Sequence, residues 1–210
     1  MPYFPLPISY SLFFMIAGLI LAAGESSRMG RDKALLIYCG QTFLETIIAM
    51  LREAGIDRIA VVLGHHAEEI RQAANLAEVE VVINPEYRRG QTSSLQAGLR
   101  ALDQPNLEGL VLCLVDHPTA TSTTVRKLVE SFRLSRAPVV IPTHQVQRGH
   151  PVLISRTLFD ELLNLGPEQG ANLVVHNYRD RTSFVEVDDG GILLDVDDDV
   201  AYRRLSQYPS

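Results

Sequence analysis

The sequence predicts an α/β protein with a Rossmann-like, doubly wound and mostly parallel sheet. Short apolar runs of strand length recur along the chain, at 16–22, 58–63, 79–83, 109–115 and 138–141. Their nearly continuous hydrophobicity is typical of strands that are buried on both faces of a parallel sheet. Helical patterns alternate with these runs, and that order favours right-handed crossovers around a single sheet.

The N-terminal apolar run, residues 8–23, raises the question of a signal peptide or a spanning helix. Residues 1–10 contain no Lys or Arg, which a secretory signal requires, and the run is marginal for the roughly 20 residues that a bilayer demands. We therefore assign its second part to the first strand and residues 1–15 to an N-terminal extension. Residues 1–14 are expected to be dispensable or to reflect a mis-chosen start codon, with Met15 as a natural start.

Three helices are predicted between the strands. The first begins at a capping box formed by Thr42 and Glu45, and Gly55 follows its end. A second helix follows the Thr-Ser-Ser segment at 92–94, and a third carries its apolar face over 125–132. These helices supply the connections that a parallel sheet needs.

The character of the chain changes after residue 142. The segment 149–154 predicts a turn that leads into a strand, while 182–187 and 191–196 predict a hairpin around an Asp-Asp-Gly-Gly turn. We expect a small antiparallel C-terminal extension packed on the main sheet. Residues 16–210 then form a single domain.

Composition excludes some classes of function. The 210 residues include 19 Lys and Arg against 25 Asp and Glu, a net charge of -6, which argues against a primary role on nucleic acid or an anionic membrane. A local pocket for a small anionic ligand remains compatible with this charge. Cys39 and Cys113 have no metal-ligand spacing and are expected to be reduced core residues of a cytoplasmic protein.

The loop at 22–33 is the first candidate site. Ligands in open α/β sheets bind beyond the carboxyl ends of the strands, and this loop follows the first strand. Gly24 and Gly30 permit backbone conformations that turn N–H groups inward, while Arg28 and Lys33 supply positive charge. The loop matches neither a P-loop nor a dinucleotide fingerprint. It is either a surface turn or a phosphate-binding loop, and its position favours phosphate binding.

Asp116 is the second candidate, at the end of the run 109–115. A carboxylate at the tip of a central strand suits Mg²⁺, which takes one or two carboxylates together with phosphate oxygens. The alternative is a helix cap, but the hydroxyl residues 121–124 already offer caps for the next helix. His117 beside it is interpreted as structural or solvated.

Acidic residues cluster near the C-terminus: Asp188, Asp189, Asp195, Asp197, Asp198 and Asp199. Most are expected to form a solvated turn and an acidic helix start. One of them completes a metal site with Asp116, and spacing does not choose between Asp195 and Asp197, which lie on the same side of an extended strand.

Two further segments carry polar groups. Thr92, Ser93 and Ser94 either cap the following helix or present donors to a base or ribose, and capping is the better interpretation from the residues alone. The segment 148–151, with Arg148 and His150, is interpreted as an exposed turn.

Taken together, these segments resemble the MobA-like nucleotidyltransferases, most closely the molybdenum cofactor cytidylyltransferases. The resemblance runs from about Ile16 to Leu205 and rests on LAAGESSRMGRDK (21–33), GHHAEE (64–69), NPEYRRGQTSSLQAGL (84–99), LVDHP (114–118), RGHPVL (148–153) and LLDVDDDVAY (193–202). The sequence departs from this resemblance at His117, where Gln is commoner, and at 198–201, where Thr-Pro-Glu-Asp is usual. Within the family, LAAG together with RGHP and a C-terminal Asp-x-Asp resembles the cytidylyl branch.

The resemblance implies Mg²⁺-dependent transfer of CMP from CTP to the terminal phosphate of a molybdopterin-type cofactor, with release of pyrophosphate. It also implies roles for residues: Leu21, Ala22, Ala23 and Gly24 line the base and ribose, Arg28 and Lys33 hold the triphosphate, Ser94 lies near the base, Asp116 is a metal ligand and Asp197 is the second carboxylate. Catalysis then depends on Arg28, Lys33 and Asp116.

Other functions stay open at this point. They are guanylyl transfer to the same acceptor, CTP-dependent transfer to a sugar or alcohol phosphate, and a cofactor-binding chaperone without enzymatic activity. The expected partners are the nucleoside triphosphate, the molybdopterin-type acceptor and a molybdoenzyme or insertion chaperone, with no nucleic acid and no membrane.

Overall fold

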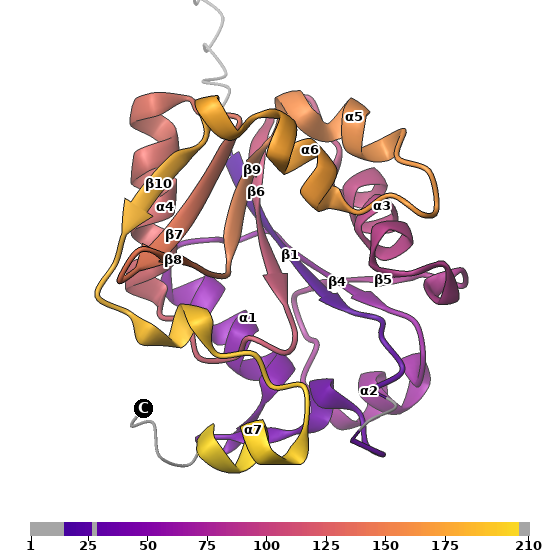
Figure 1. Cartoon of the computed structure of the whole chain (residues 1–210). Helices are drawn as coiled ribbons and strands as arrows, with labels where there is room; N and C mark the ends of the chain where they lie inside the picture. The colour runs from indigo at the N-terminus through magenta and orange to yellow at the C-terminus, as the bar shows by residue number, and fades with distance from the viewer. Residues whose placement is uncertain (1–14, 27–28, 206–210) are drawn as a thin grey trace, which may run out of the picture.

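A single large sheet forms the centre of the computed structural model, which describes residues 15–26 and 29–205. The strands run in the order β10-β7-β9-β6-β1-β4-β5, and β8 pairs with β7 (Figure 1). Their bounds are β1 (Met15–Ala22), β4 (Ile59–Leu63), β5 (Glu80–Ile83), β6 (Leu107–Leu114), β7 (Val139–His144), β8 (Gln147–Arg148), β9 (Val152–Ser155) and β10 (Ser183–Glu186). The five apolar runs of the sequence correspond to β1, β4, β5, β6 and β7, which confirms the predicted fold class.

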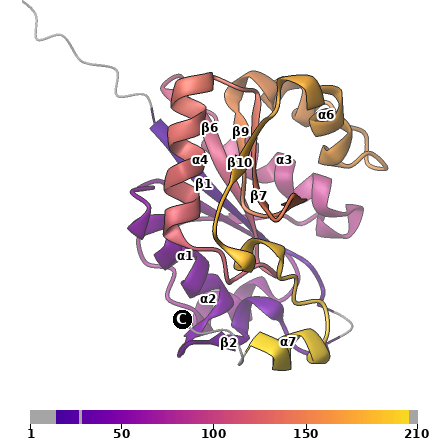
Figure 2. The same cartoon turned by 60° about the vertical axis from the view of Figure 1, so that its left-hand side comes forward.

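Helices cover both faces of this sheet, as a doubly wound fold requires (Figure 1 and Figure 2). Their bounds are α1 (Phe43–Glu53), α2 (Ala67–Ala73), α3 (Gln91–Leu102), α4 (Ser122–Ser135), α5 (Phe159–Leu163), α6 (Ala171–Asn177) and α7 (Asp199–Leu205). Short 3-10 turns are η1 (Lys33–Leu35), η2 (Tyr87–Arg89), η3 (Arg156–Leu158), η4 (Arg179–Arg181) and η5 (Gly190–Leu193). Side chains from α1 and α4 form one hydrophobic core with the sheet, and side chains from α3, α5 and α6 form another.

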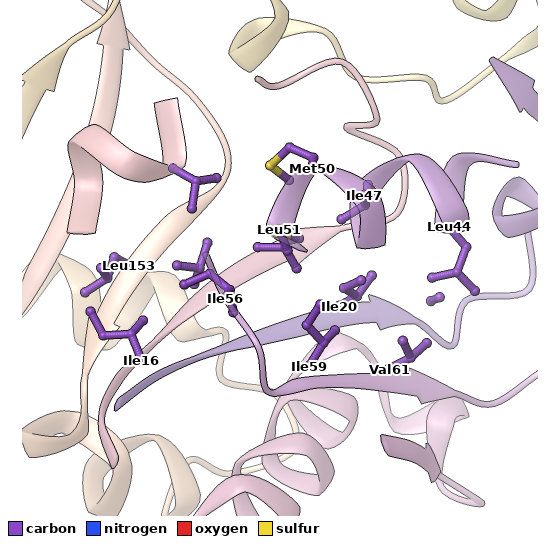
Figure 3. Packing of buried hydrophobic residues seen from close by; sticks show 14 of the residues in the cluster. Ile16, Ile20, Leu44, Ile47, Met50, Leu51, Ile56, Ile59, Val61 and Leu153 are labelled. Carbon is purple, nitrogen blue, oxygen red and sulfur yellow. The ribbon is translucent and has the colours of Figure 1, made fainter. Parts of the chain in front are cut away.

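The start of α1 is determined locally. The Thr42 hydroxyl accepts a hydrogen bond from the Glu45 backbone N–H, and the Thr42 N–H donates to the Glu45 carboxylate at 2.9 Å. This confirms the predicted capping box. The apolar face of the helix, including Ile47 and Leu51, packs on Ile20 of β1 (Figure 3). Full burial of each such side chain stabilises the fold by about 1.5–3 kcal/mol.

The antiparallel part differs from the predicted C-terminal hairpin. β9 lies between β6 and β7 and is antiparallel to both, whereas β10 is parallel to β7. The predicted hairpin between 182–187 and 191–196 is therefore wrong. Asp189 accepts a hydrogen bond from the Gly191 N–H and caps η5, which directs the chain away from β10. A small separate hairpin, β2 (Ile37–Tyr38) with β3 (Gln41–Thr42), precedes α1.

Two expectations about burial are also corrected. β5 pairs only with β4 in the described sheet, so it is an edge strand, and its Ile83 is 46% exposed. The predicted burial of this run on both faces is wrong. Cys113 is buried in β6, but Cys39 is exposed at the turn between β2 and β3 and is not a core residue.

The apolar run at 8–23 includes β1 rather than a helix from Met15 onward. None of the helices within 15–26 and 29–205 combines the length and the hydrophobicity needed to cross a bilayer. Residues 1–14 lie outside the described residues, and the expected N-terminal extension stays a prediction.

Candidate active site

A cavity of about 450 Å³ opens beyond the ends of β1, β5 and β6. Its walls come from the loops that follow these strands and from the start of α3, as expected for a ligand site in an open α/β sheet. Eight residues singled out in the sequence line it: Leu21, Ala22, Ala23, Gly24, Lys33, Ser94, Asp116 and Asp197. Arg28 lies outside the described residues, so its predicted role stays a prediction. The structure thus brings the predicted loop and the predicted carboxylates together around one cavity.

The loop after β1 folds back on itself and directs Lys33 into this cavity. The Lys33 backbone N–H donates to the Ser26 hydroxyl, and the Asp32 carboxylate caps η1 by accepting from the Ala34 N–H. Gly30 has φ 61°, a left-handed conformation that glycine adopts without strain.

Lys33 lies between two carboxylates. Its Nζ atom donates to Asp116 Oδ2 at 3.3 Å and to Asp197 Oδ1 at 2.6 Å. Burial lowers the pKa of the ammonium, but the hydrogen bond with Asp197 and the charges of both carboxylates outweigh this effect, so the Lys33 pKa is raised. The lysine is therefore fully protonated at neutral pH and offers a fixed positive charge to a phosphate.

Asp116 is held at the tip of β6 by the main chain. The Val115 N–H donates to the Leu21 carbonyl, and the Val196 N–H donates to the Asp116 carbonyl at 3.0 Å. The second contact ties the C-terminal segment to the end of the sheet. Thr121 caps α4, so Asp116 is not needed as that cap, in agreement with the sequence argument.

Asp195 and Asp197, between which the sequence did not choose a second metal ligand, have different neighbours. Residues 194–197 form an irregular segment rather than an extended strand. Asp197 binds Lys33, whereas Asp195 lies with Asp116 and His117 so that one ligand atom of each falls within 4.8 Å of the others. Burial and the neighbouring Asp116 charge raise the pKa of Asp195, as expected for crowded carboxylates.

This arrangement fits a divalent cation. Asp116 Oδ1 is buried and has no hydrogen-bond partner within the described part of the chain. A buried carboxylate oxygen without a partner is costly, and a bound cation removes that cost. Carboxylate oxygens are also the donors that hard divalent cations prefer.

The sequence analysis interpreted 148–151 as an exposed turn, but His150 is only partly exposed, so this interpretation is wrong for His150. Its ring lies 4.9 Å from the His117 ring, and burial lowers the pKa of His150 to about 4, with a smaller contribution from His117. One ligand atom of His117 lies within 4.8 Å of Asp116, and the charge of Asp116 also acts on His150, so both imidazoles lie near this carboxylate. Arg148, two residues earlier, is exposed as predicted.

Ser94 faces the cavity from inside α3. The helix begins at Gln91 after Gly90, and no side chain caps it, so the capping interpretation of Thr92, Ser93 and Ser94 is wrong. The Ser94 oxygen accepts from Asn84 Nδ2 at 3.0 Å, which leaves its hydroxyl proton available for an acceptor atom of a ligand.

Sequence reasoning gave no role to Tyr87 in η2 or to the Gly-His-His segment after β4. Tyr87 lines the cavity, and its hydroxyl lies 3.1 Å from His65 Nδ1. A Cβ atom on Gly64 would lie 2.8 Å from the Ala23 carbonyl, so only glycine lets this loop approach the first one. The signal was present, because the Gly-His-His segment follows a strand at the ligand-binding edge of the sheet.

Two other aspartates of the C-terminal cluster, Asp189 and Asp198, have structural roles. Asp189 is buried and accepts from the Thr121 N–H and hydroxyl and from the Thr124 hydroxyl, so it is not part of a solvated turn. Asp198 accepts from the N–H groups of the first turn of α7, which confirms the predicted acidic helix start.

A family model described as the MobA-like NTP transferase domain matches residues 18–182. The chain belongs to the MobA-like NTP transferase family. An Escherichia coli (strain K12) protein named molybdenum cofactor cytidylyltransferase is 30% identical to this family member over 183 residues, 85% of this chain and 89% of that protein. A Paenarthrobacter nicotinovorans protein named nicotine blue oxidoreductase is 34% identical over 149 residues, 68% of this chain and 72% of that protein.

The MobA-like chain is also similar to solved structures. The crystal structure of Rv0371c from Mycobacterium tuberculosis H37Rv aligns with a TM-score of 0.83 at 34% identity and covers 92% of this chain and 98% of that one. A structure of the same mycobacterial protein in complex with manganese aligns with a TM-score of 0.78 at 33% identity, with the same coverage.

Proposed function

We propose that this chain is a nucleotidyltransferase that moves CMP from CTP onto the terminal phosphate of a molybdopterin-type cofactor and releases pyrophosphate. The observation that carries the proposal is the position of Lys33 Nζ between Asp116 and Asp197 in a cavity that the loop after β1 also lines. A triphosphate needs a cationic group of this kind, and a divalent cation needs the carboxylates beside it.

The residues divide the work of binding. The segment 21–24 and the Ser94 hydroxyl face the base and ribose, while Lys33, together with Arg28, holds the triphosphate. An incoming phosphate takes the place of the carboxylates as the partner of the Lys33 ammonium. Nucleotide binding therefore replaces the ion pairs of Lys33 with Asp116 and Asp197 by an ion pair with phosphate. Lys33 then stabilises the negative charge that develops on the departing pyrophosphate.

Asp116 and Asp197 would hold Mg²⁺, because they present carboxylate oxygens at the edge of the phosphate-binding part of the cavity. When bound, the cation neutralises charge on the phosphate oxygens and reduces the repulsion between the two anionic substrates. The manganese in the Rv0371c complex supports a divalent cation for a related protein.

The acceptor phosphate is already ionised at neutral pH and requires no protein base. Burial raises the pKa of the Cys113 thiol, so this residue does not serve as a nucleophile. Catalysis then rests on alignment of the two phosphates and on neutralisation of their charge.

The choice of CTP is supported by the LAAG and RGHP segments and by the name of the Escherichia coli relative. A relative from Opitutus terrae, 31% identical over 125 residues, is named a probable molybdenum cofactor guanylyltransferase, which keeps GTP as the alternative. The Paenarthrobacter relative shows that membership of the family alone does not define the reaction.

The test is pyrophosphate release from each of the four NTPs, with and without molybdopterin. We expect release that depends on molybdopterin and is fastest with CTP. Asp116→Asn should abolish most of it, whereas Asp188→Asn, which changes an exposed carboxylate, should not. Nucleotide binding without release would favour a chaperone. Failure with every NTP, together with binding of a reduced nicotinamide nucleotide, would favour a redox reaction.

A further inference from the structure

A second cavity, of about 600 Å³, lies between α6 and the strands β7, β8 and β10, and we call it the α6 cavity. Ile141 of β7 and Phe184 of β10 line it from the sheet, and Leu173 lines it from α6. Phe184 is 42% exposed and Leu173 is 43% exposed, so two large apolar side chains are open to solvent here. None of the lining residues lines the cavity of the candidate active site. The α6 cavity is therefore a further place where a ligand can bind.

Two arginines give the α6 cavity positive charge. Arg148 of β8 and Arg179 of η4 line it, against one carboxylate, that of Glu168. In the part of the chain that the structure describes, no carboxylate forms an ion pair with either guanidinium. The whole chain carries a net charge of -6, so a cavity in which cations outnumber carboxylates differs from the rest of the molecule. This charge suits an anionic ligand.

The guanidinium of Arg148 is held on an aromatic ring. Its Cζ atom lies over the Phe184 ring, 4.6 Å from the ring centroid. A guanidinium is planar and stacks on aromatic faces, so this contact orients Arg148 at the edge of the cavity. A second flat ring can stack on the same pair, while the N–H groups of the arginines donate to its carbonyl or anionic groups. The α6 cavity therefore fits a flat, polar heterocycle that carries negative charge.

The α6 cavity adjoins the active site through two segments. Arg148 is two residues from His150, so their Cα atoms are at most about 7 Å apart, and the charge of Asp116 acts on His150. The Thr92 hydroxyl donates to the Gln169 carbonyl at 2.7 Å, which joins the start of α3 to the rim of the α6 cavity. Both helices, α3 and α6, lie on the same face of the sheet, opposite α4 (Figure 2). One elongated ligand can therefore extend from the end of β6 into the α6 cavity.

A second substrate needs this additional space. The active-site cavity of about 450 Å³ lies in the lower half of the range, about 300–1,000 Å³, that binds one small molecule. A nucleoside triphosphate in it leaves the ring system of an acceptor to be bound outside. The reacting phosphate of that acceptor must still reach the α-phosphate of the nucleotide.

We propose that the α6 cavity binds the ring end of the acceptor, with the acceptor's terminal phosphate directed toward Lys33 and Asp116. The acceptor is then a phosphate monoester of a flat, polar heterocycle, the chemical class to which a molybdopterin-type cofactor belongs. Arg148, Arg179 and Phe184 are its binding residues and take no part in the transfer itself. This inference rests on the proposed function for the reaction, and adds which part of the chain recognises the acceptor.

The experiment measures acceptor binding and turnover separately on the full chain. Binding is followed by the fluorescence of hydroxymethylpterin monophosphate, an oxidised pterin, with molybdopterin and inorganic phosphate as competitors. Calorimetry measures CTP binding, and the KM for molybdopterin comes from pyrophosphate release. The variants are Arg148→Gln, Arg179→Gln and Phe184→Leu. The matched control is Arg133→Gln, which changes an exposed arginine on α4.

We expect the wild type and the control to bind the pterin monophosphate, and molybdopterin to displace it. Arg148→Gln and Arg179→Gln should each raise the Kd for the pterin and the KM for molybdopterin by about tenfold or more. Phe184→Leu should raise both by about threefold, because it removes the ring on which Arg148 lies. The Kd for CTP and kcat at saturating molybdopterin should stay unchanged, as expected when only acceptor binding is lost.

The proposal is overturned by a wild type that does not bind the pterin monophosphate, or by equal pterin affinity in the wild type and both arginine variants. Displacement by inorganic phosphate alone would also overturn it, as would loss of CTP binding in the same variants. Pterin binding that depends on the arginines, without pyrophosphate release from any NTP, would refute the proposed function and keep this subsite. CTP turnover with an unaltered KM for molybdopterin in every variant would do the reverse.

Discussion

Replacing Lys33 with methionine removes the ammonium that lies 3.3 Å from Asp116 Oδ2 and 2.6 Å from Asp197 Oδ1. Methionine keeps most of the stem of the side chain, which is only 13% exposed, so the loss is mainly that of charge. The ion pairs are partly exposed and contribute more than surface pairs but less than buried ones, about 1 kcal/mol. That loss corresponds to a decrease in Tm of about 2–4 °C.

Activity should fall much further than stability. Loss of one group that stabilises charge on the leaving pyrophosphate costs about 100- to 1,000-fold in kcat. The assay is steady-state pyrophosphate release at saturating CTP, with thermal unfolding followed by circular dichroism. Lys127→Met, which changes an exposed lysine on α4, is the matched control, and Lys33→Arg should restore part of the rate. A Lys33→Met enzyme with kcat within about threefold of the wild type would refute the proposed role of this lysine.

Three further changes test how the site is supported. Gly64→Ala places a Cβ 2.8 Å from the Ala23 carbonyl and should raise the KM for CTP; an unchanged KM in the steady-state assay would contradict this packing argument. Asp189→Ala removes a buried carboxylate that accepts several hydrogen bonds and should lower the free energy of unfolding in urea by about 2–3 kcal/mol. Burial raises the pKa of Glu45, but hydrogen bonds from the Asn75 N–H and from Thr42 outweigh it and lower the pKa overall, so its stabilisation is present above the ordinary pKa and is lost as pH falls. Glu45→Gln should therefore cost about 1 kcal/mol at pH 7 and less at acidic pH, which urea unfolding at both pH values would check.

The sequence predicts the central strands well because the apolar composition that defines them lies within each short segment. The runs at β1 and β6 are continuously apolar, and burial on both faces requires that composition. The same reasoning places Lys33 and Asp116 at one edge of the sheet, since parallel strands share their carboxyl ends. This part of the site follows from topology alone.

The features that sequence reasoning missed depend on long-range contacts. The position of β9 between β6 and β7 is a matter of strand pairing, which an isolated run at 152–155 does not encode. The separation of Asp195 from Asp197 follows from an irregular path fixed by a main-chain hydrogen bond to Asp116. A period of two residues, appropriate for a strand, placed both carboxylates on one side.

The hydrogen bond from Lys33 to Asp197 joins residues 164 positions apart in the chain. A ribosome therefore adds 164 residues after the lysine before this carboxylate is available to it. A nascent chain that has made β1 and the loop after it still lacks the segment that closes the phosphate end of the cavity. Assembly of this centre consequently follows synthesis of every strand of the described sheet, and fragments released before Asp197 would carry the loop without its acidic counterpart.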